Sequence, residues 1–289
     1  MVVIEHRTYR REDAEELVTA LGAWDADGLH VTGLHSGDLG WHLRSADEVV
    51  TGSLHGWWAD GTMVAAALLE DDWGARPRIG PDQLRSFDVA RAVREVVEGL
   101  TAEQIWSDAA PGTAWRHLLL QGGWGLDPDL WVALHRDAAT PVGSLRRGLR
   151  VARAEQDVEG RVHAQRHGFD GSTFDAPSWE RMAAGPGYRP ELDLVLHDDD
   201  GAACAVATAW LPQGGGTALL EPVAVHRDRR GEGFGRAVVD AAVEACLASG
   251  ASGVSVSTPE SNTGAVAAYL SAKFLRMQTL EGLTRRRSA

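Results

Sequence analysis

The sequence predicts an α/β protein made of two tandem halves, and three observations support this prediction. Apolar runs typical of strands alternate with runs of helical periodicity along the 289 residues. A strand, a glycine-rich turn and a helix follow one another at 219–247 in the second half. Landmarks of the first half recur in the second, which indicates an internal repeat. These are Arg7-x-x-Arg10 and Arg150-x-x-Arg153, Asp60-Gly61 and Asp200-Gly201, and Gly123-Trp124 and Lys273-Phe274.

The repeat divides the chain into a first domain at 1–137 and a second domain at 149–289. Between them, residues 138–148 contain alanine, threonine, proline, glycine and serine followed by two arginines. This composition is typical of a linker, because it has no apolar period with which to form a packed element.

In the first domain, apolar spacing predicts the elements, and glycine and proline mark their ends. Asp60-Gly61 is a tight-turn signal and predicts a hairpin between two strands. Residues 24–40 and 71–81 are expected to be loops. The expected strands cover 2–10, 48–58, 62–69 and 130–134, and the expected helices cover 11–21, 84–100 and 113–120.

The second domain shows the same kind of pattern. Asp198-Asp199-Asp200-Gly201 is again a turn signal between two apolar runs. The expected strands cover 149–153, 192–197, 203–211, 219–225 and 253–258, and the expected helices cover 154–169, 179–184, 237–247 and a segment opened by Asn262.

The glycine-rich turn has the features of an anion-binding loop. Gly231, Gly233 and Gly235 alternate with other residues between a buried strand and a helix. Glycine lets backbone N–H groups approach a ligand closely, and the free N–H groups at a helix start favour a phosphate. The spacing is neither that of the dinucleotide fingerprint nor that of a P-loop. An ordinary tight turn before a helix is the alternative interpretation.

Two motifs resemble those of the GCN5-related N-acetyltransferases (GNAT). Arg230-x-x-Gly233-x-Gly235 is similar to the acyl-CoA pyrophosphate loop of that family. Asn262-x-x-Ala265-x-x-x-Tyr269-x-x-x-Lys273-Phe274 is similar to a second family motif, in which glycine usually stands at the position of Lys273. The resemblance covers residues from about 149 to the C-terminus.

The resemblance implies two GNAT-like domains, each with a central mixed, mostly antiparallel sheet flanked by helices. It implies acetyl-CoA as acyl donor, with pantetheine bound along Val223, Ala224 and Val225. The pyrophosphate is then expected on one continuous loop, in which the side chain of Arg230 adds charge. The loop consists of Arg230, Gly231, Glu232, Gly233, Phe234, Gly235 and Arg236.

Two catalytic residues are expected on the same ground. Glu221 lies in an apolar strand, where burial would raise its pKa and make it a useful base; pairing with an arginine is the alternative. Tyr269 is the expected general acid for the departing thiolate, and a core tyrosine is the alternative. Asn262 is expected to cap its helix and to contact the cofactor. Pro222 fits a bulge or splay point of the strand, or else an edge strand.

The first domain lacks this chemistry. Residues 79–93 contain Gly80 alone and no Arg-x-x-Gly-x-Gly, and Gly112 and Leu119 stand where Asn262 and Tyr269 are expected. We therefore expect a degenerate GNAT-like domain that kept the fold and lost the acyl-CoA site. This layout is similar to that of mycothiol synthase.

Composition limits partners and location. The net charge of −13 argues against binding to nucleic acid or anionic membranes. Two cysteines, Cys204 and Cys246, are expected as buried thiols in a reducing cytoplasm. The N-terminus has no signal-peptide pattern, and no apolar run is long enough to span a bilayer. No Cys/His cluster has zinc spacing, so no metal is expected. A monomer or homodimer is expected.

The sequence therefore predicts an N-acetyltransferase that transfers an acetyl group to the amine of a small molecule by direct attack. A noncatalytic acyl-CoA-binding protein is one alternative. An aminoacyl-tRNA-dependent transferase of similar fold is another, and the negative charge argues against it.

Overall fold

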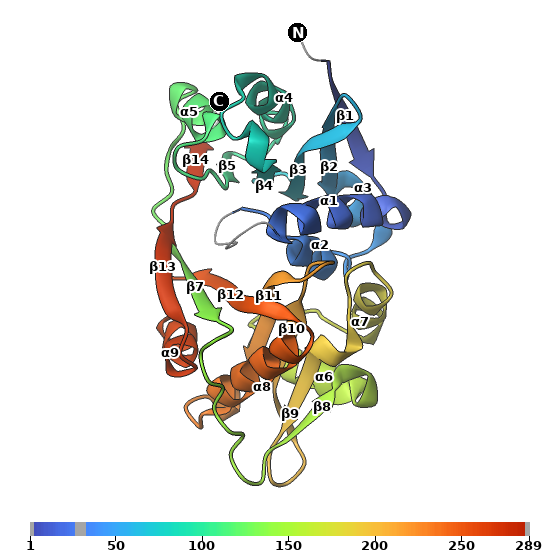
Figure 1. Ribbon diagram of the computed structural model, residues 1–289, viewed down its shortest axis with the longest axis vertical. Coiled ribbons are helices and arrows are strands. Elements are labelled where there is room, and N and C mark those ends of the chain that lie inside the picture. The colour runs from blue at the N-terminus through green and yellow to red at the C-terminus, as the bar shows by residue number, and fades with distance from the viewer. Residues whose placement is uncertain (1–2, 27–32, 287–289) are drawn as a thin grey trace.

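The computed structural model describes residues 3–26 and 33–286, which form two sheets flanked by helices. Each sheet has seven strands within this part of the chain. In Figure 1 one sheet occupies the upper part of the molecule and the other the lower part. The predicted mixed α/β architecture in two tandem units is thus confirmed.

The elements of the upper unit come mostly from the first half of the chain. Its helices are α1 Ala14–Ala26, α2 Ser36–His42, α3 Asp47–Ser53, α4 Phe87–Val97 and α5 Ala114–Gln121. Its strands are β1 Ile4–Tyr9, β2 Leu54–Ala59, β3 Thr62–Glu70, β4 Gly74–Ile79, β5 Gln104–Ser107, β6 Gly125–Leu126 and β14 Leu283–Arg286.

The lower unit comes mostly from the second half. Its helices are α6 Val158–Gly168, α7 Ala176–Ala183, α8 Phe234–Ala248 and α9 Thr263–Ser271. Its strands are β7 Trp131–Asp137, β8 Arg150–Arg153, β9 Asp193–His197, β10 Ala203–Trp210, β11 Gly216–Val225, β12 Ala251–Pro259 and β13 Leu275–Leu280.

The two sheets have the same topology, and each contains one strand from the other half. The upper order is β1-β2-β3-β4-β5-β14-β6, and the lower order, read from β8, is β8-β9-β10-β11-β12-β7-β13. The pairs β4–β5 and β11–β12 are parallel, and the other pairs are antiparallel. β7 and β14 therefore occupy equivalent places in exchanged sheets, as their colours show in Figure 1. The domain boundary at 137 and 149 stays a prediction, and these two strands cross it.

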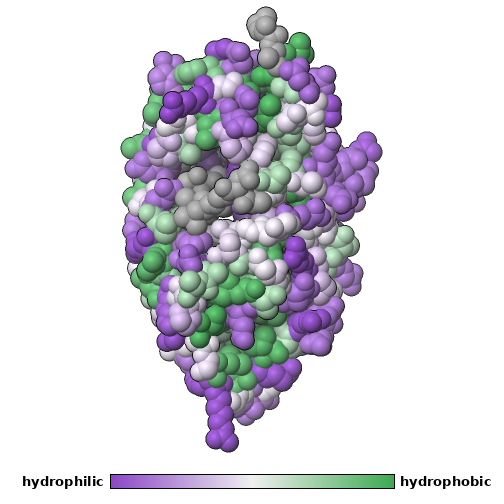
Figure 2. Space-filling model, viewed as in Figure 1, coloured by the Kyte–Doolittle hydropathy of each residue, from purple (hydrophilic) through white to green (hydrophobic). Residues whose placement is uncertain are grey.

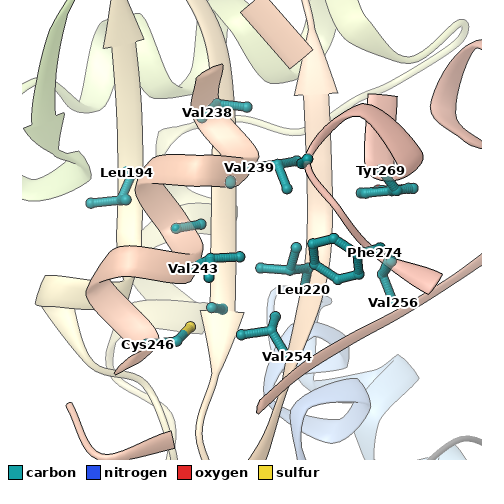
Figure 3. Close-up of a cluster of buried hydrophobic side chains, with 14 of the residues drawn as sticks. Leu194, Leu220, Val238, Val239, Val243, Cys246, Val254, Val256, Tyr269 and Phe274 are labelled. Carbon is teal, nitrogen blue, oxygen red and sulfur yellow. The ribbon is translucent and has the colours of Figure 1, made fainter. Parts of the chain in front are cut away.

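Each sheet is covered on both faces. In the lower unit, α8 and α9 pack on one face and α6 on the other. Figure 3 shows Val239, Val243 and Cys246 of α8 against Leu220 of β11 and Val254 of β12. Both cysteines are buried free thiols. In the upper unit α4 and α5 cover one face, and α1 to α3 cover the other.

The exchanged strand β7 is anchored by a buried arginine. The guanidinium of Arg136 donates to Asp240 Oδ1 of α8 at 2.9 Å, to the carbonyl of Ala272 after α9, and to the carbonyl of Pro141 at 2.9 Å. Because a buried charge is costly when it lacks partners, this arrangement fixes β7 and both helices together. Residues 138–149, which include the predicted linker, form neither helix nor strand.

The two units meet where α2 lies across the lower sheet. A Cβ added to Gly37 would lie 2.4 Å from Trp210, and one added to Gly40 would lie 2.3 Å from its ring. These two glycines, one turn apart, let α2 approach β10 far more closely than any other residue would permit. The approach brings side chains of the first half to the centre of the second sheet.

Three sequence predictions for the first half were wrong. The expected loop at 24–40 contains the end of α1 and most of α2, while 27–32 lie outside the described residues. The expected strand at 48–58 begins instead as helix α3, and the expected loop at 71–81 contains β4. The short or exposed strands β5, β6, β13 and β14 were not predicted, because too few apolar residues alternate in them.

No helix in residues 3–26 and 33–286 combines the length and apolar character needed to cross a bilayer. In the view of Figure 2, hydrophobic residues gather on the lower half of this face and are interspersed with hydrophilic ones.

Candidate active site

The central strand β11 is interrupted by a bulge at Glu221 and Pro222. Opposite β10, Ala209 pairs with Leu220 and Ala207 pairs with Val223, so two residues of β11 face Thr208 alone. The Glu221–Pro222 peptide bond is cis. The bulge predicted for Pro222 is therefore present, and it lies in an interior strand rather than an edge strand.

Beyond the bulge, β11 separates from its parallel neighbour. Its pairing with β12 ends at Leu219 opposite Ser255, although β11 continues to Val225. His226 donates its N–H to the carbonyl of Cys204 at 2.9 Å, so alternate residues such as Ala224 face β10. The backbone groups of Val223 and Val225 therefore point toward the side that β12 has left. An extended ligand with amide groups could pair there.

The glycine-rich turn follows directly and ends at the start of α8. Gly231 and Gly233 have φ of 85° and 87°, which strongly favours glycine at both positions. An added Cβ at either residue meets no atom within 4 Å, so the turn faces open space. Gly233 is the N-cap of α8 and has no side chain to satisfy the first N–H groups of the helix. These groups and the helix dipole are suited to hold a phosphate.

The side chains of the turn are held by the surrounding protein. Arg230 donates to the carbonyl of Gly168 at the end of α6, at 2.7 Å. Glu232 pairs with Arg229 at 3.1 Å, and Arg236 pairs with Asp240 at 3.4 Å. Phe234 is buried at 1% exposure in the core. The side chain of Arg230 thus links the turn to α6, and the prediction that it adds charge at a phosphate gains no support from this contact.

Sequence reasoning missed one cation near the turn. The guanidinium of Arg146, from the segment between the halves, lies 5.4 Å from the ring of Phe234 and donates to the carbonyl of Glu232 at 3.4 Å. Its place in a linker gave no signal of this proximity.

Glu221 lies in a setting that favours its neutral form. Burial raises the pKa of Glu221 to about 7, and the negative charge of Asp38 acts in the same direction. The positive charges of Arg76 and Arg44 oppose this shift. Among the described residues, none forms a hydrogen bond or salt bridge with this carboxylate. The alternative interpretation, in which Glu221 pairs with an arginine, is therefore not supported. A carboxyl group that titrates near neutrality can accept a proton from a substrate.

The charges around Glu221 come from the first half of the chain. Arg76 of β4 pairs with Asp38 of α2 at 3.0 Å and with Asp108 at 3.4 Å. Glu70, at the end of β3, also acts on the pKa of Glu221. Burial raises the pKa of Glu70 as well. Sequence reasoning missed this group of charges, because its members are distant in the chain and most of α2 was expected to be a loop.

Tyr269 lies on α9 with its ring in the core. Its exposure is 5%, and its ring centroid lies 5.7 Å from that of Phe274 (Figure 3). Its hydroxyl has no hydrogen-bond partner among the described residues. Burial raises the pKa of Tyr269, and the negative charge of Glu221 raises it further. The phenol therefore keeps its proton at neutral pH and could donate it.

Asn262 caps α9, as expected. Its Oδ1 accepts the N–H of Ala265 at 3.2 Å. In the first half Thr113 caps α5 in the same way, whereas the spacing had pointed to Gly112. The difference arises because helix α5 has eight residues and helix α9 has nine. Leu119 accepts the N–H of Trp124 as Tyr269 accepts that of Phe274, so these positions are equivalent.

The first half has no equivalent of the glycine-rich turn. The connection from β4 to α4 ends at Ser86, whose side chain accepts the N–H of Val89. The helix start is thus occupied by its own cap. A ligand phosphate would have to compete with Ser86 for these N–H groups, and the loss of the acyl-CoA site from this half stays a prediction.

A cavity of about 620 Å³ lies between the two halves. Its wall includes Val18 of α1, Gly37 of α2, Tyr188 from the loop before β9, and Trp210 of β10. The indole N–H of Trp210 donates to the backbone carbonyl of Glu221 at 2.6 Å, so one residue of the cavity wall contacts the bulge of β11. Tyr188 and Arg189, from the loop before β9, thus contribute to the wall of this cavity.

Comparison with known families finds one match, in the second half. Residues 163–274 match the model of the Acetyltransferase (GNAT) family. No curated protein matches the sequence.

Solved structures resemble the whole chain. A GCN5-related N-acetyltransferase from Sphaerobacter thermophilus is 17% identical with a TM-score of 0.60, covering 99% of this chain and 97% of its own. A tandem GNAT protein from the clavulanic acid biosynthesis pathway is 16% identical with a TM-score of 0.64, covering 99% of both chains. A GNAT acetyltransferase from Colwellia psychrerythraea is 14% identical with a TM-score of 0.61, covering 99% and 100%.

At these identities the likeness shows the fold alone, and the chain has the fold of tandem GNAT proteins. The similarity in layout to mycothiol synthase remains a prediction.

Proposed function

We propose that this chain, which matches the GNAT family model at residues 163–274, transfers the acetyl group of acetyl-CoA to the amine of a small molecule. The observation that carries the proposal is the open edge of β11. Pairing with β12 ends at Leu219, the bulge at Glu221 follows, and the glycine-rich turn stands at the far end. The edge that would bind the donor and the candidate base therefore lie on one strand, and the phosphate cradle follows directly after it.

The donor would lie along β11 and over the start of α8. The free backbone groups of Val223 and Val225 suit the amides of pantetheine, while Ala224 is committed to β10. The N–H groups from Gly231 to Arg236 suit the pyrophosphate, and Arg146 adds positive charge near them. The side chain of Asn262 is already engaged in its cap, so we assign it a structural role.

Glu221 and Tyr269 divide the proton transfers. Glu221 in its ionised form takes a proton from the attacking amine, directly or through a water molecule. The amine nitrogen bonds to the thioester carbonyl carbon, and the C–S bond then breaks. Tyr269 gives its phenolic proton to the departing thiolate, so that free CoA leaves as a thiol. Before the next turnover, Glu221 releases its proton to solvent and the Tyr269 phenolate takes one up from solvent, so both groups return to their starting forms.

The acceptor would enter through the cavity between the halves. Asp38 and Glu70 place negative charge near Glu221, which favours an acceptor that carries positive charge beside the reacting amine. The first half therefore acts as a wall of the acceptor site after the loss of its own cradle. The cavity volume fits a small molecule rather than a folded partner.

Release of free CoA from acetyl-CoA, measured across a panel of small amines, tests the proposal. We expect at least one amine to stimulate release, and Glu221→Gln to abolish most of the stimulation. Glu95→Gln, at an exposed carboxylate on helix α4 of the upper unit, is the matched control. Acetyl-CoA binding without release for any amine would favour a noncatalytic acyl-CoA-binding protein. Activity that requires aminoacyl-tRNA would favour the other alternative.

Cytoplasmic location, the absence of a nucleic-acid partner and a monomeric or dimeric state remain predictions. Size-exclusion chromatography with light scattering measures the last of these directly.

A further inference from the structure

Three histidines from two separate segments meet beside the glycine-rich turn. His163 and His167 lie one turn apart on α6, and His226 follows β11. Each offers one ring nitrogen within 4.8 Å of the other two. Their ring centroids are 4.2 Å apart for His163 and His167, 4.6 Å for His167 and His226, and 5.2 Å for His163 and His226.

The spacing of the nitrogens is close to that of a metal site. Nitrogens bound to one zinc ion at its usual bond length in a tetrahedral site lie about 3.3 Å apart. Small rotations of partly exposed side chains can close a gap from 4.8 Å. Two histidines at positions i and i+4 of a helix, joined by a third from another segment, present three ligands toward one point.

A neighbouring group orients one of the rings for metal binding. His167 Nδ1 lies 2.8 Å from the carbonyl of His163, so Nδ1 carries the proton and Nε2 is free to bind a cation. Such a partner on the second ring nitrogen is usual for metal-binding histidines. His226 Nδ1 instead accepts the N–H of Asp228 at 3.3 Å. Metal binding through His226 Nε2 therefore requires this ring to leave that bond and to donate Nδ1–H to a carboxylate such as that of Asp228, which lies 4.0 Å away.

The surroundings place further charge near the cluster. The C-terminal end of α6, which favours a cation, lies next to His167. Two arginines already bind its last carbonyls: Arg227 donates to the carbonyl of His167, and Arg230 donates to the carbonyl of Gly168. Arg227 also pairs with Asp170 at 3.2 Å, which offsets part of its charge.

We propose that His163, His167 and His226 bind a divalent transition-metal ion, with zinc as the best match, between α6 and the turn that opens the phosphate cradle. Three imidazoles leave a fourth position for water or another ligand. The ion would join α6 to residues 226–230 at the point where two arginines already link them. Sequence spacing did not predict this site, because His226 is far along the chain from the helical pair.

Metal binding is tested without any reference to acetyl transfer. Tag-free protein stripped with a chelator is titrated with zinc chloride at pH 7.5 by calorimetry, and cobalt(II) absorption reports the coordination geometry. We expect one ion per chain and a higher unfolding temperature with zinc. His163→Gln, His167→Gln and His226→Gln should each weaken zinc binding about tenfold or more.

Two other histidines provide controls. His117 is exposed on α5, and His6 stacks on His55 with ring nitrogens 2.9 Å apart. His117→Gln and His6→Gln should leave zinc affinity unchanged. Circular dichroism confirms that each variant folds. Loss of binding in His6→Gln, unchanged affinity in the three cluster variants, or no stoichiometric binding to the parent protein would each overturn the proposal.

A second titration asks whether the site is linked to the cradle, and this part rests on the proposed function. Acetyl-CoA affinity is measured with and without zinc in the parent and in His163→Gln. We expect zinc to tighten acetyl-CoA binding in the parent alone. If zinc binds but leaves acetyl-CoA affinity unchanged in both, the metal site stands and its link to the cradle is refuted.

Discussion

The indole N–H of Trp210 donates to the backbone carbonyl of Glu221 at 2.6 Å, across the bulge of β11. The same indole lies beneath Gly37 and Gly40 of α2, so one side chain supports the bulge and receives the first half of the chain. The position of the candidate base is therefore fixed by both halves.

The acetylation rate should depend on the ionisation of Glu221. Burial raises the pKa of Glu221 to about 7, and the base is the deprotonated form. We expect kcat/KM to fall about tenfold per pH unit below pH 7 and to level off above it. Glu221→Gln should remove this limb as well as most of the activity. A limb that persists in the residual activity of Glu221→Gln would assign the titration to another group.

The raised pKa of Glu221 also makes folding stability depend on pH, and stability falls over the range in which activity rises. Because the folded protein holds the proton up to about pH 7 while the unfolded chain loses it near 4.5, the contribution of Glu221 to stability falls as pH rises between these values. Denaturant titrations of the parent and Glu221→Gln across this range should diverge, with the variant gaining relative stability at the higher pH.

Replacement of Tyr269 by phenylalanine should lower kcat while leaving stability nearly unchanged. The ring keeps its packing against Phe274, and the lost hydroxyl has no partner among the described residues. A general acid contributes about 10²-fold or more to rate. Steady-state kinetics and thermal unfolding of Tyr269→Phe measure both effects. A large loss of stability with normal kcat would identify Tyr269 as a core residue only.

Gly37→Ala should loosen the docking of the two units. The added methyl would lie 2.4 Å from Trp210, which is itself 2% exposed and unable to move away. Overpacking of this kind costs about 1–3 kcal/mol of unfolding free energy. Gly52→Ala, in helix α3 with no atom within 4 Å, is the matched control and should be neutral or slightly stabilising. Equal effects of the two substitutions would contradict the close approach.

Asp193 should be among the most sensitive positions in the lower unit. Its carboxylate accepts from Arg161 Nε at 2.9 Å, Thr208 Oγ1 at 2.8 Å and Trp179 Nε1 at 2.9 Å. Arg161 and Asp193 are both fully buried, so Asp193→Ala leaves an uncompensated charge and should cost about 3–5 kcal/mol. In contrast, Glu260→Gln breaks an exposed pair with Arg276 and should cost less than about 1 kcal/mol. Denaturant unfolding compares the two.

The sequence predicted the second half better than the first, for physical reasons. Strands such as the one predicted at 203–211 are continuous apolar runs. The turn at 230–236 has three glycines, which are required by the backbone conformation of the turn itself. Such signals depend on neighbouring residues alone. The tandem architecture followed from the repeat, and the shared order of the two sheets confirms it.

Features that depend on distant contacts could not be predicted. Helix α2 has only seven residues and two glycines, and it is stabilised by packing on Trp210. β14 has only four residues, ends in two consecutive arginines, and pairs with β5 from the other half. The charges of Asp38, Arg76 and Glu70 near Glu221 arise from this same docking. The sequence therefore predicted the burial of the candidate base and missed the charges that act on its pKa.

The central claim is that the turn at 230–236 binds the pyrophosphate of acetyl-CoA. Thermal unfolding with and without acetyl-CoA tests it on the parent, Gly233→Glu and Gly61→Glu. Gly61 also has positive φ, 75° against 87° for Gly233, and open space around it, so both variants acquire similar strain and the same charge. We expect acetyl-CoA to raise the midpoint of the parent and of Gly61→Glu, and to leave Gly233→Glu unchanged. Equal stabilisation of all three proteins, or of none, would contradict the account.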